Sequence, residues 1–331
     1  MSTKSDYIYK NISTLVRKIE SSNLSLSLLI GKNISFSLSV KVHSLFYQYH
    51  GIDKLSYLIY DTLDDCKNPS WNFKQALLLL EYYNVVGINI TSPYKIYPFP
   101  STYKCIVDNL NENLDCKLIK DNLHAVNTLV KYDGKSYYTS TDMLGLDYSL
   151  KKYGYKNGIE DFSNLIILGS GGMSRSILDF IKDNPNLKVF MLSRSHPDFI
   201  DELSFKNLNI NCFSLSSDGL KQFIDSINQD EHILIINTLL NSVDTSWCFW
   251  VFDNLPSSIK GRICFMDLNY VKSNGSMLEK EASFFKTNSI HFIDGRDMLI
   301  AQAVYSEILW NKLSLDKEEF RSTHKFIDSN L

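Results

Sequence analysis

Short runs of apolar residues alternate along the chain with segments whose apolar residues recur at helical spacing. Apolar runs bounded by glycine or polar residues predict buried strands. They lie at 26–30, 55–60, 85–90, 165–168, 187–192, 232–237 and 262–268. Helical spacing is found at 40–50, 73–83 and 173–181. Strands that alternate with helices in this way predict an α/β protein with parallel strands.

Local signals add detail in the first half of the chain. Ser39 is placed to cap the helix expected at 40–50, and Gly51 is placed to end it. Strand-like runs at 125–130 and 136–139 flank an Asp-Gly pair, which is typical of a hairpin turn. The next helical pattern begins at an acidic residue, Asp142, and carries Leu146, Leu150 and Tyr153.

A glycine cluster lies directly between the apolar run at 165–168 and the helical pattern that follows it. Such a loop exposes backbone amides and a helix N-terminus, which together bind phosphate. A tight strand-to-helix turn also favours glycine for conformational reasons alone. The strand before and the helix after the cluster favour the phosphate-binding interpretation. The expected phosphate-binding residues are Gly169, Ser170, Gly171, Gly172 and Met173.

The residues after the run at 187–192 indicate which nucleotide is bound. In a dinucleotide-binding domain an acid at this strand end binds the 2′-hydroxyl of NAD. The chain has Ser193-Arg194-Ser195 there, and no acid before Asp198. A guanidinium suits a 2′-phosphate, which favours NADP(H), although a solvated surface arginine is the plain alternative. Residues from about 146 to 290 are therefore interpreted as one doubly wound domain.

Polar side chains gather where the predicted strands of the first half end. Ligands of an α/β sheet bind at the carboxyl ends of its strands. The set comprises Ser37, Ser39, Asn89, Thr91, Lys95, Asn127, Thr128 and Asp142. Together these hydroxyls, amides, ammonium and carboxylate suit a small polyhydroxylated acid. Taken singly, each is also typical of a cap, a turn or a solvated charge.

Composition narrows the class of protein further. The 331 residues predict two domains, and a formal net charge of −3 argues against nucleic acid or an anionic membrane as a partner. The N-terminus lacks the apolar core of a signal peptide, and no apolar run is long enough to span a bilayer. The six cysteines form no CxxC pair, so neither a metal site nor a disulfide framework is expected, and a cytoplasmic location fits.

Eight segments, in this order along the chain, resemble motifs of the shikimate dehydrogenase family. They are 31–39 (the family's G-x-P-x-x-H-S-x-S), 87–95 (G-x-N-V-T-x-P-x-K), 125–128 (A-V-N-T), 140–142 (N-T-D), 169–175 (the glycine loop), 193–195 (N-R-T), 267–270 (D-x-x-Y) and 294–302 (D-G-x-x-M-L-x-x-Q). The resemblance runs from about residue 26 to 311. Each motif is short, but their shared order makes coincidence improbable.

The resemblance implies a fold and a reaction. It implies an N-terminal α/β substrate domain, residues 1–142 plus 298–331, to which a C-terminal helix returns. A Rossmann-type doubly wound NADP-binding domain is expected at 143–297. The implied reaction is the reversible NADPH-dependent reduction of 3-dehydroshikimate to shikimate, a step towards chorismate and the aromatic amino acids. A small-molecule substrate and a monomer or homodimer are expected.

The resemblance also implies roles for individual residues. Lys95 and Asp142 are expected to transfer the proton at the reacting oxygen. The expected substrate-binding residues are Ser37, Ser39, Asn89, Thr91, Asn127, Tyr270 and Gln302. To the phosphate-binding residues above, the cofactor site adds Ser193, Arg194, Ser195, Asn237 and Gly295.

Departures from the family motifs gather on the cofactor side. The family's N-A-T-P-x-G-M is represented at 237–243 by Asn-Thr-Leu-Leu-Asn-Ser-Val, and Asp297 replaces a glycine. Two alternatives to a shikimate dehydrogenase therefore stay open. One is a dehydrogenase of a related cyclic hydroxy acid, such as quinate or an aminoshikimate. The other is a catalytically weak relative that binds shikimate.

Overall fold

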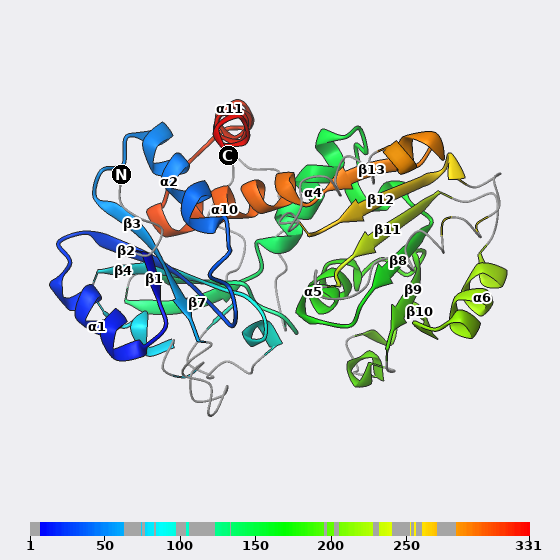
Figure 1. The fold of residues 1–331 in the computed structure, drawn as a ribbon, viewed down its shortest axis with the longest axis horizontal. Coiled ribbons are helices and arrows are strands. Elements are labelled where there is room, and N and C mark those ends of the chain that lie inside the picture. The colour runs from blue at the N-terminus through cyan, green and yellow to red at the C-terminus, as the bar shows by residue number, and fades with distance from the viewer. Residues whose placement is uncertain are drawn as a thin grey trace. The chain divides into compact units, whose positions relative to one another are not determined.

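The chain forms two compact units. Unit 1 comprises Met1–Gly145 and Leu299–Leu331, and unit 2 comprises Leu146–Met298. The computed structural model (Figure 1) describes residues 7–62, 74, 77–82, 84–96, 104–105, 123–132, 134–194, 197–201, 205–227, 232–239, 252, 255, 260–269 and 283–331. Within those ranges, no helix is both long and apolar enough to cross a membrane.

Unit 1 is built on a sheet that has seven strands in the described part of the chain, in the order β1-β3-β2-β4-β6-β7-β5. The strands are β1 (Ile8–Tyr9), β2 (Ser25–Gly31), β3 (Leu55–Asp61), β4 (Val85–Ile90), β5 (Lys104–Cys105), β6 (Thr128–Tyr132) and β7 (Lys135–Thr139). The strands predicted from the apolar runs at 26–30, 55–60 and 85–90 are thereby confirmed. They pair in parallel, as the alternation with helices predicted.

The other part of this sheet is antiparallel. β6 runs antiparallel to β4 and forms a hairpin with β7, so the sheet is mixed. The hairpin was predicted, but β6 begins at Thr128, later than the apolar run suggested. The residues before it bond elsewhere, because the Val126 N–H donates to the Lys95 carbonyl and the Asn127 N–H donates to the Thr139 carbonyl. This irregular stretch leaves the Asn127 side chain free to take part in a site.

Helices cover both faces of the unit 1 sheet (Figure 1). They are α1 (Ile12–Ser21), α2 (Ser39–His50), α10 (Arg296–Asn311) and α11 (Lys317–Asn330). Leu15 and Ile19 of α1 pack with alternate residues of β2, whereas the intervening Ser27 bonds the Tyr47 hydroxyl of α2 at 2.8 Å. Two apolar faces with helices on each explain why β2 is buried almost throughout.

Helix α10 packs against the sheet where the Trp310 indole lies over Gly87. A Cβ on Gly87 would lie 1.9 Å from Trp310 Nε1, so no larger residue fits there. The same Nε1 donates to the Leu129 carbonyl at 2.8 Å. Gly87 of β4 therefore allows the close approach of the C-terminal helix to the strands that carry the site.

The ends of α2 differ in part from the prediction. Gly51 ends the helix in the left-handed conformation, as predicted. Ser39 is the first helical residue, so its expected role as the cap is wrong. The Ser37 hydroxyl instead accepts the Ser39 N–H at 3.2 Å. Of the helix predicted at 73–83, the described residues 74 and 77–79 are helical and 80–82 form a turn, whereas 73, 75, 76 and 83 lie outside the described ranges.

Unit 2 is a doubly wound parallel sheet, as predicted. Within the described residues it has six strands in the order β10-β9-β8-β11-β12-β13. They are β8 (Asn164–Leu168), β9 (Lys188–Ser193), β10 (Asn209–Ser214), β11 (Ile233–Asn237), β12 (Ile263–Asp267) and β13 (His291–Asp294). Numbered along the chain from β8, this is the order 3-2-1-4-5-6, which reverses direction between β8 and β11. That reversal marks the position where dinucleotides bind in such folds.

The unit 2 sheet is enclosed by helices and aromatic side chains. α5 (Gly172–Ile181) follows β8, α6 (Ser217–Ser226) follows β10, and α4 (Asp142–Lys152) begins at Asp142 as predicted. Every residue of β8, β11 and β12 is buried. A sheet buried on both faces holds its strand ends rigidly, which positions the loops that follow them.

Candidate active site

Lys95 and Asp142 form an ion pair in unit 1. Their Nζ and Oδ2 atoms lie 2.6 Å apart, and the two side chains are 15% and 5% exposed. Lys95 lies in the short helix η2 (Tyr94–Ile96), after β4, and Asp142 is the first residue of α4, after β7. A carboxylate in the first turn of a helix is stabilised by the helix dipole. The fold thus brings together the two residues for which the resemblance implied a role in proton transfer.

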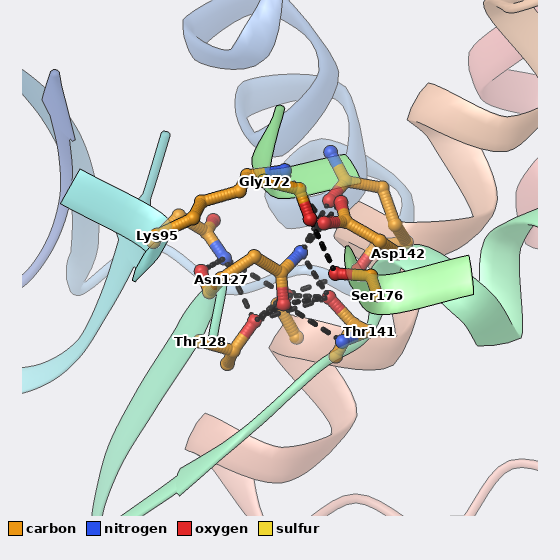
Figure 2. A network of polar contacts seen from close by, with 10 residues as sticks. Lys95, Asn127, Thr128, Thr141, Asp142, Gly172 and Ser176 are labelled. Atoms are coloured by element: carbon orange, nitrogen blue, oxygen red, sulfur yellow. Dashed lines mark hydrogen bonds and ion pairs between the residues drawn. The ribbon is translucent and has the colours of Figure 1, made fainter. Parts of the chain in front are cut away.

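The Asn127 side chain holds the other oxygen of this carboxylate (Figure 2). Its Oδ1 accepts the Thr141 backbone N–H at 2.7 Å. A backbone N–H can only donate, so the amide nitrogen of Asn127 must face the opposite way. There it donates to Asp142 Oδ1 at 2.9 Å. Both carboxylate oxygens are therefore engaged, one by Lys95 and one by Asn127.

Gln302 of α10 completes this group. Its Oε1 accepts from the Asn127 amide at 2.9 Å. Four residues far apart in the sequence thus form one contiguous site in unit 1, as the resemblance implied for them: Lys95, Asn127, Asp142 and Gln302. The site presents an ammonium, a carboxylate and two amides, which suits a ligand rich in oxygen atoms.

Asn89, which was also expected to bind substrate, makes buried contacts with Tyr57, Asn127 and Ser306. It is 7% exposed, and its Oδ1 accepts from the Tyr57 hydroxyl at 2.9 Å. Its amide nitrogen donates to the Asn127 carbonyl at 3.3 Å and to Ser306 Oγ at 3.1 Å. Thr91 is the next residue along the chain that was expected to bind substrate. Its side chain lies against Gly31, since a Cβ on Gly31 would lie 2.5 Å from Thr91 Cγ2.

Ser37 and Ser39 form a hydroxyl pair at the start of α2. Their Oγ atoms lie 3.0 Å apart, and both residues are buried. Asp61 shapes the loop that leads to them. Its Oδ1 accepts the Asn33 N–H at 2.8 Å, and its Oδ2 accepts both the N–H and the hydroxyl of Ser35.

Asp61 is a structural residue that the sequence analysis missed. It is fully buried at the end of β3, where it organises the loop between residues 31 and 39. An acid that directly ends an apolar run was the available signal. Because the loop carries Ser37 and Ser39, the Asp61 carboxylate indirectly positions those two hydroxyls.

The glycine loop of unit 2 fits a phosphate. Gly169 has φ +109°, and a Cβ there would lie 2.6 Å from Thr238 Oγ1. A Cβ on Gly171, by contrast, would meet nothing within 4 Å. Gly171 precedes α5 and offers no side chain to cap it, so the first helical amides face an open approach. Open backbone amides at a helix N-terminus are a site for an anion.

The strand end at β9 fits a further phosphate. Ser193 is the buried last residue of β9, and the exposed Arg194 follows it. β9 is the neighbour of β8 in the sheet, so Arg194 follows the strand beside the one that leads into the glycine loop. An exposed guanidinium in that position suits the 2′-phosphate of NADP(H). Ser195 lies outside the described residues.

Asn237 and Gly295 have structural contacts in unit 2. The Asn237 amide donates to Asp267 Oδ1 at 3.1 Å, joining the ends of β11 and β12. A Cβ on Gly295 would lie 2.7 Å from the Leu268 carbonyl oxygen, so glycine is required by the close approach of the two backbones. Asp297 is buried and pairs with Lys152 at 2.6 Å. Tyr270 and the divergent residues 240–243 lie outside the described ranges.

Within the described part of the chain, no group of three or more His, Cys, Asp or Glu side chains could hold a metal ion.

A nucleotide-binding sheet in one unit and a lysine–carboxylate pair in the other define the class, which is that of two-unit, dinucleotide-binding α/β proteins. No family model matches the chain. A shikimate dehydrogenase (NADP(+)) from Clostridium perfringens is 30% identical over 297 residues, covering 87% of this chain and 93% of the relative. One from Prochlorococcus marinus is 29% identical, covering 87% and 92%. The chain belongs to the shikimate dehydrogenase family.

Solved structures have the same fold. A chorismate mutase/shikimate 5-dehydrogenase fusion protein from Clostridium acetobutylicum has a TM-score of 0.66 at 21% identity, covering 93% of this chain and 98% of that one. A shikimate 5-dehydrogenase from Listeria monocytogenes, in complex with shikimate and NAD, has 0.63 at 18%, covering 91% and 96%. A 5-ketofructose reductase from Gluconobacter has 0.62 at 16%, covering 93% and 99%.

Proposed function

We propose that this protein catalyses the reversible, NADPH-dependent reduction of 3-dehydroshikimate to shikimate. Family membership supports the reaction class, and the observation that carries the assignment is the Lys95–Asp142 pair held by Asn127. The fold alone does not select this substrate, since a 5-ketofructose reductase shares it. The residues in unit 1 therefore have to carry the argument.

Lys95 supplies the proton in this reaction. NADPH, when bound, supplies the hydride to the carbonyl carbon. The carbonyl oxygen gains a proton as the C=O bond becomes C–OH, and Lys95 Nζ donates it. Asp142 Oδ2, 2.6 Å away, directs the ammonium and balances its charge. In the direction of oxidation, the same proton returns to Lys95.

The amides and hydroxyls of unit 1 hold the substrate. Asn127 and Gln302 lie beside the carboxylate of Asp142 and present polar atoms that suit ring hydroxyls. Ser37 and Ser39 form a buried hydroxyl pair at the start of α2, which suits the substrate carboxylate. Thr91 and Tyr270 are proposed as further substrate contacts on the resemblance.

The nucleotide is held in unit 2. The open amides at Gly171 and Gly172 would bind the pyrophosphate, and Arg194 would bind the 2′-phosphate. Ser170 and Met173 of the same loop, and Ser193 and Ser195 beside the arginine, complete this proposed site. Asn237 and Gly295 contribute by fixing the backbone at the ends of β11 and β13.

Absorbance of the reduced nicotinamide tests the proposal directly. Purified protein is mixed with shikimate and NADP⁺, and the assay is repeated with NAD⁺ and with quinate. Formation of NADPH from NADP⁺ in the presence of shikimate supports the proposal. Faster formation of NADPH with quinate would mean that the substrate is a related hydroxy acid. If no pair reacts while shikimate still raises the melting temperature, the protein binds shikimate without turning it over.

A further inference from the structure

A buried chain of polar contacts leads away from the Asp142 carboxylate and ends at a tyrosine that the proposed mechanism does not use. Tyr57 of β3 is 1% exposed, and its hydroxyl donates to Asn89 Oδ1 at 2.9 Å. β2 lies between β3 and β4, so the Tyr57 side chain reaches across one strand to meet Asn89. Gly87, two residues before Asn89 on the same face of β4, leaves room for Trp310 there.

The Tyr57 ring is fixed by the groups that surround it. The His43 ring stacks on it with centroids 3.8 Å apart and planes at 9°. His43 Nδ1 lies 2.5 Å from Glu307 Oε1, and both of these side chains are buried. Glu307 also accepts from the Tyr47 hydroxyl at 2.8 Å. A buried carboxylate with several partners is costly to disturb, so this group anchors the stack.

The Asn89 amide has only one orientation that satisfies its neighbours. Its nitrogen lies 3.3 Å from the Asn127 backbone carbonyl, which can only accept a hydrogen bond. Its Oδ1 must therefore face Tyr57, whose hydroxyl is the donor. The same nitrogen lies 3.1 Å from Ser306 Oγ, which adds a contact to α10.

Asn127 is thus held from two directions. Asn89 bonds its backbone carbonyl, and Thr141 bonds its side-chain oxygen through a backbone N–H. Its amide nitrogen is left facing Asp142 Oδ1 (Figure 2). Without the Tyr57 hydroxyl, Asn89 Oδ1 would be a buried acceptor with one partner fewer, and rotation of its amide would release the Asn127 carbonyl.

We propose that the Tyr57 hydroxyl is a positioning group for catalysis, acting through Asn89 to hold Asn127 against the Asp142 carboxylate. As a statement about catalysis this rests on the proposed dehydrogenase function. Tyr57 touches neither substrate nor nucleotide in this role. Its effect falls on the geometry of the Lys95–Asp142 pair, which determines the rate of proton transfer more than the affinity for substrate.

Two matched variants test the proposal. Tyr57→Phe removes one buried hydroxyl and keeps the ring that stacks on His43. Tyr47→Phe removes another buried hydroxyl, whose hydrogen bonds go to Ser27 and Glu307. The first should lower kcat about tenfold, the effect of about 1.4 kcal/mol of lost transition-state stabilisation, with KM for shikimate changed less than about twofold. The second should lower the melting temperature and leave kcat within about twofold.

Equal kcat values for Tyr57→Phe and the unmodified protein would overturn the proposal, as would equal losses in the two variants. A readout without turnover separates it from the proposed function. In ligand-free protein labelled with ¹⁵N-asparagine, the side-chain amide signals of Asn89 and Asn127 should shift in Tyr57→Phe and stay in place in Tyr47→Phe. The two signals are assigned by their loss in Asn89→Ser and Asn127→Ser.

Unmoved amide signals would overturn the positioning role whatever the activity. If the signals shift but the unmodified protein turns over no substrate, the proposed function has failed and the catalytic part of this inference is overturned with it.

Discussion

The site in unit 1 is made mainly of side chains, whereas the site in unit 2 is made mainly of backbone amides. In unit 1, side chains define the site: Lys95 and Asn127 each bond the Asp142 carboxylate, and each of the three needs its own functional group. In unit 2, the loop between β8 and α5 offers backbone amides, and it depends on glycine mainly for space and conformation. A site made of side chains depends on residue identity, whereas one made of backbone depends on the path of the chain.

The departures from the family motifs are distributed unevenly between the two units. The unit 1 motifs at 87–95 and 125–128 are nearly complete, and the departures gather in unit 2, at 237–243 and at Asp297. The Asp297 carboxylate bonds Lys152, and residues 240–243 lie outside the described ranges, so these departures do not fall in the loop of backbone amides. In unit 1, the lysine and the asparagine each bond the same aspartate through their own functional group.

The largest expected effect comes from removing the lysine of the side-chain site. Lys95→Ala should lower kcat about 10³-fold, because the proton donor at the reacting oxygen is lost. Shikimate binding, measured by calorimetry, should be largely retained, since the remaining polar groups stay in place. Lys151→Ala, which removes an exposed lysine from an i,i+4 pair with Asp147, is the matched control and should leave kcat unchanged. Activity near that of the unmodified protein in Lys95→Ala would show that another group moves the proton.

A glycine in unit 1 tests how far backbone positions tolerate change. Gly87→Ala places a Cβ 1.9 Å from Trp310 Nε1, so α10 must shift. We expect a loss of about 3 kcal/mol in the free energy of unfolding, the upper range for overpacking. Gly261→Ala is the control, because a Cβ there meets nothing within 4 Å. Urea denaturation followed by circular dichroism measures both, and equal stability of the two variants would contradict the tight seat of Trp310.

Much of the fold followed from periodicity, because buried parallel strands produce uninterrupted apolar runs that are easily recognised. The direction of β6 relative to β4 did not follow, since an apolar run looks the same in either direction, and these two strands are antiparallel. The start of α2 was missed by one residue: Leu38 precedes the helix without a side-chain cap, although serine is the better cap by composition.

The site was predictable where a residue type is chemically distinctive. Lys95 and Asp142 supplied the ammonium and the carboxylate of the polar set at the strand ends, the resemblance implied that they act together, and they do meet. Tyr57 and Glu307 did not stand out, because a tyrosine in a strand and a glutamate in a helix are ordinary residues there. Their importance comes from burial and from contacts between positions 57 and 89 or 43 and 307, which no local pattern encodes.

Arg194 is the point at which unit 2 also depends on a side chain. Arg194→Ala should raise KM for NADPH about tenfold, the effect of losing a charged hydrogen bond to phosphate. KM for NADH, which lacks the 2′-phosphate, should change little. Lys221→Ala serves as the control, because it removes an exposed lysine of α6 in the same unit, and it should alter KM for NADPH less than about threefold. Equal losses for both nucleotides in Arg194→Ala would contradict the phosphate contact.

The smallest effect at neutral pH is expected in the sheet of unit 2, where a thiol is buried near the start of β12. Burial raises the pKa of Cys264 from 9.0 to about 12. Between these values the unfolded chain loses a proton that the folded chain retains, so stability is complete below about pH 9 and falls as the pH rises. Cys264→Ala should therefore flatten the decline of the melting temperature between about pH 8 and 10, with little change at pH 7. Cys212→Ala is the matched control, because that cysteine is only partly buried. An unchanged decline in Cys264→Ala would mean that other groups, such as the half-buried Tyr155 phenol beside it, set the alkaline limit of this unit.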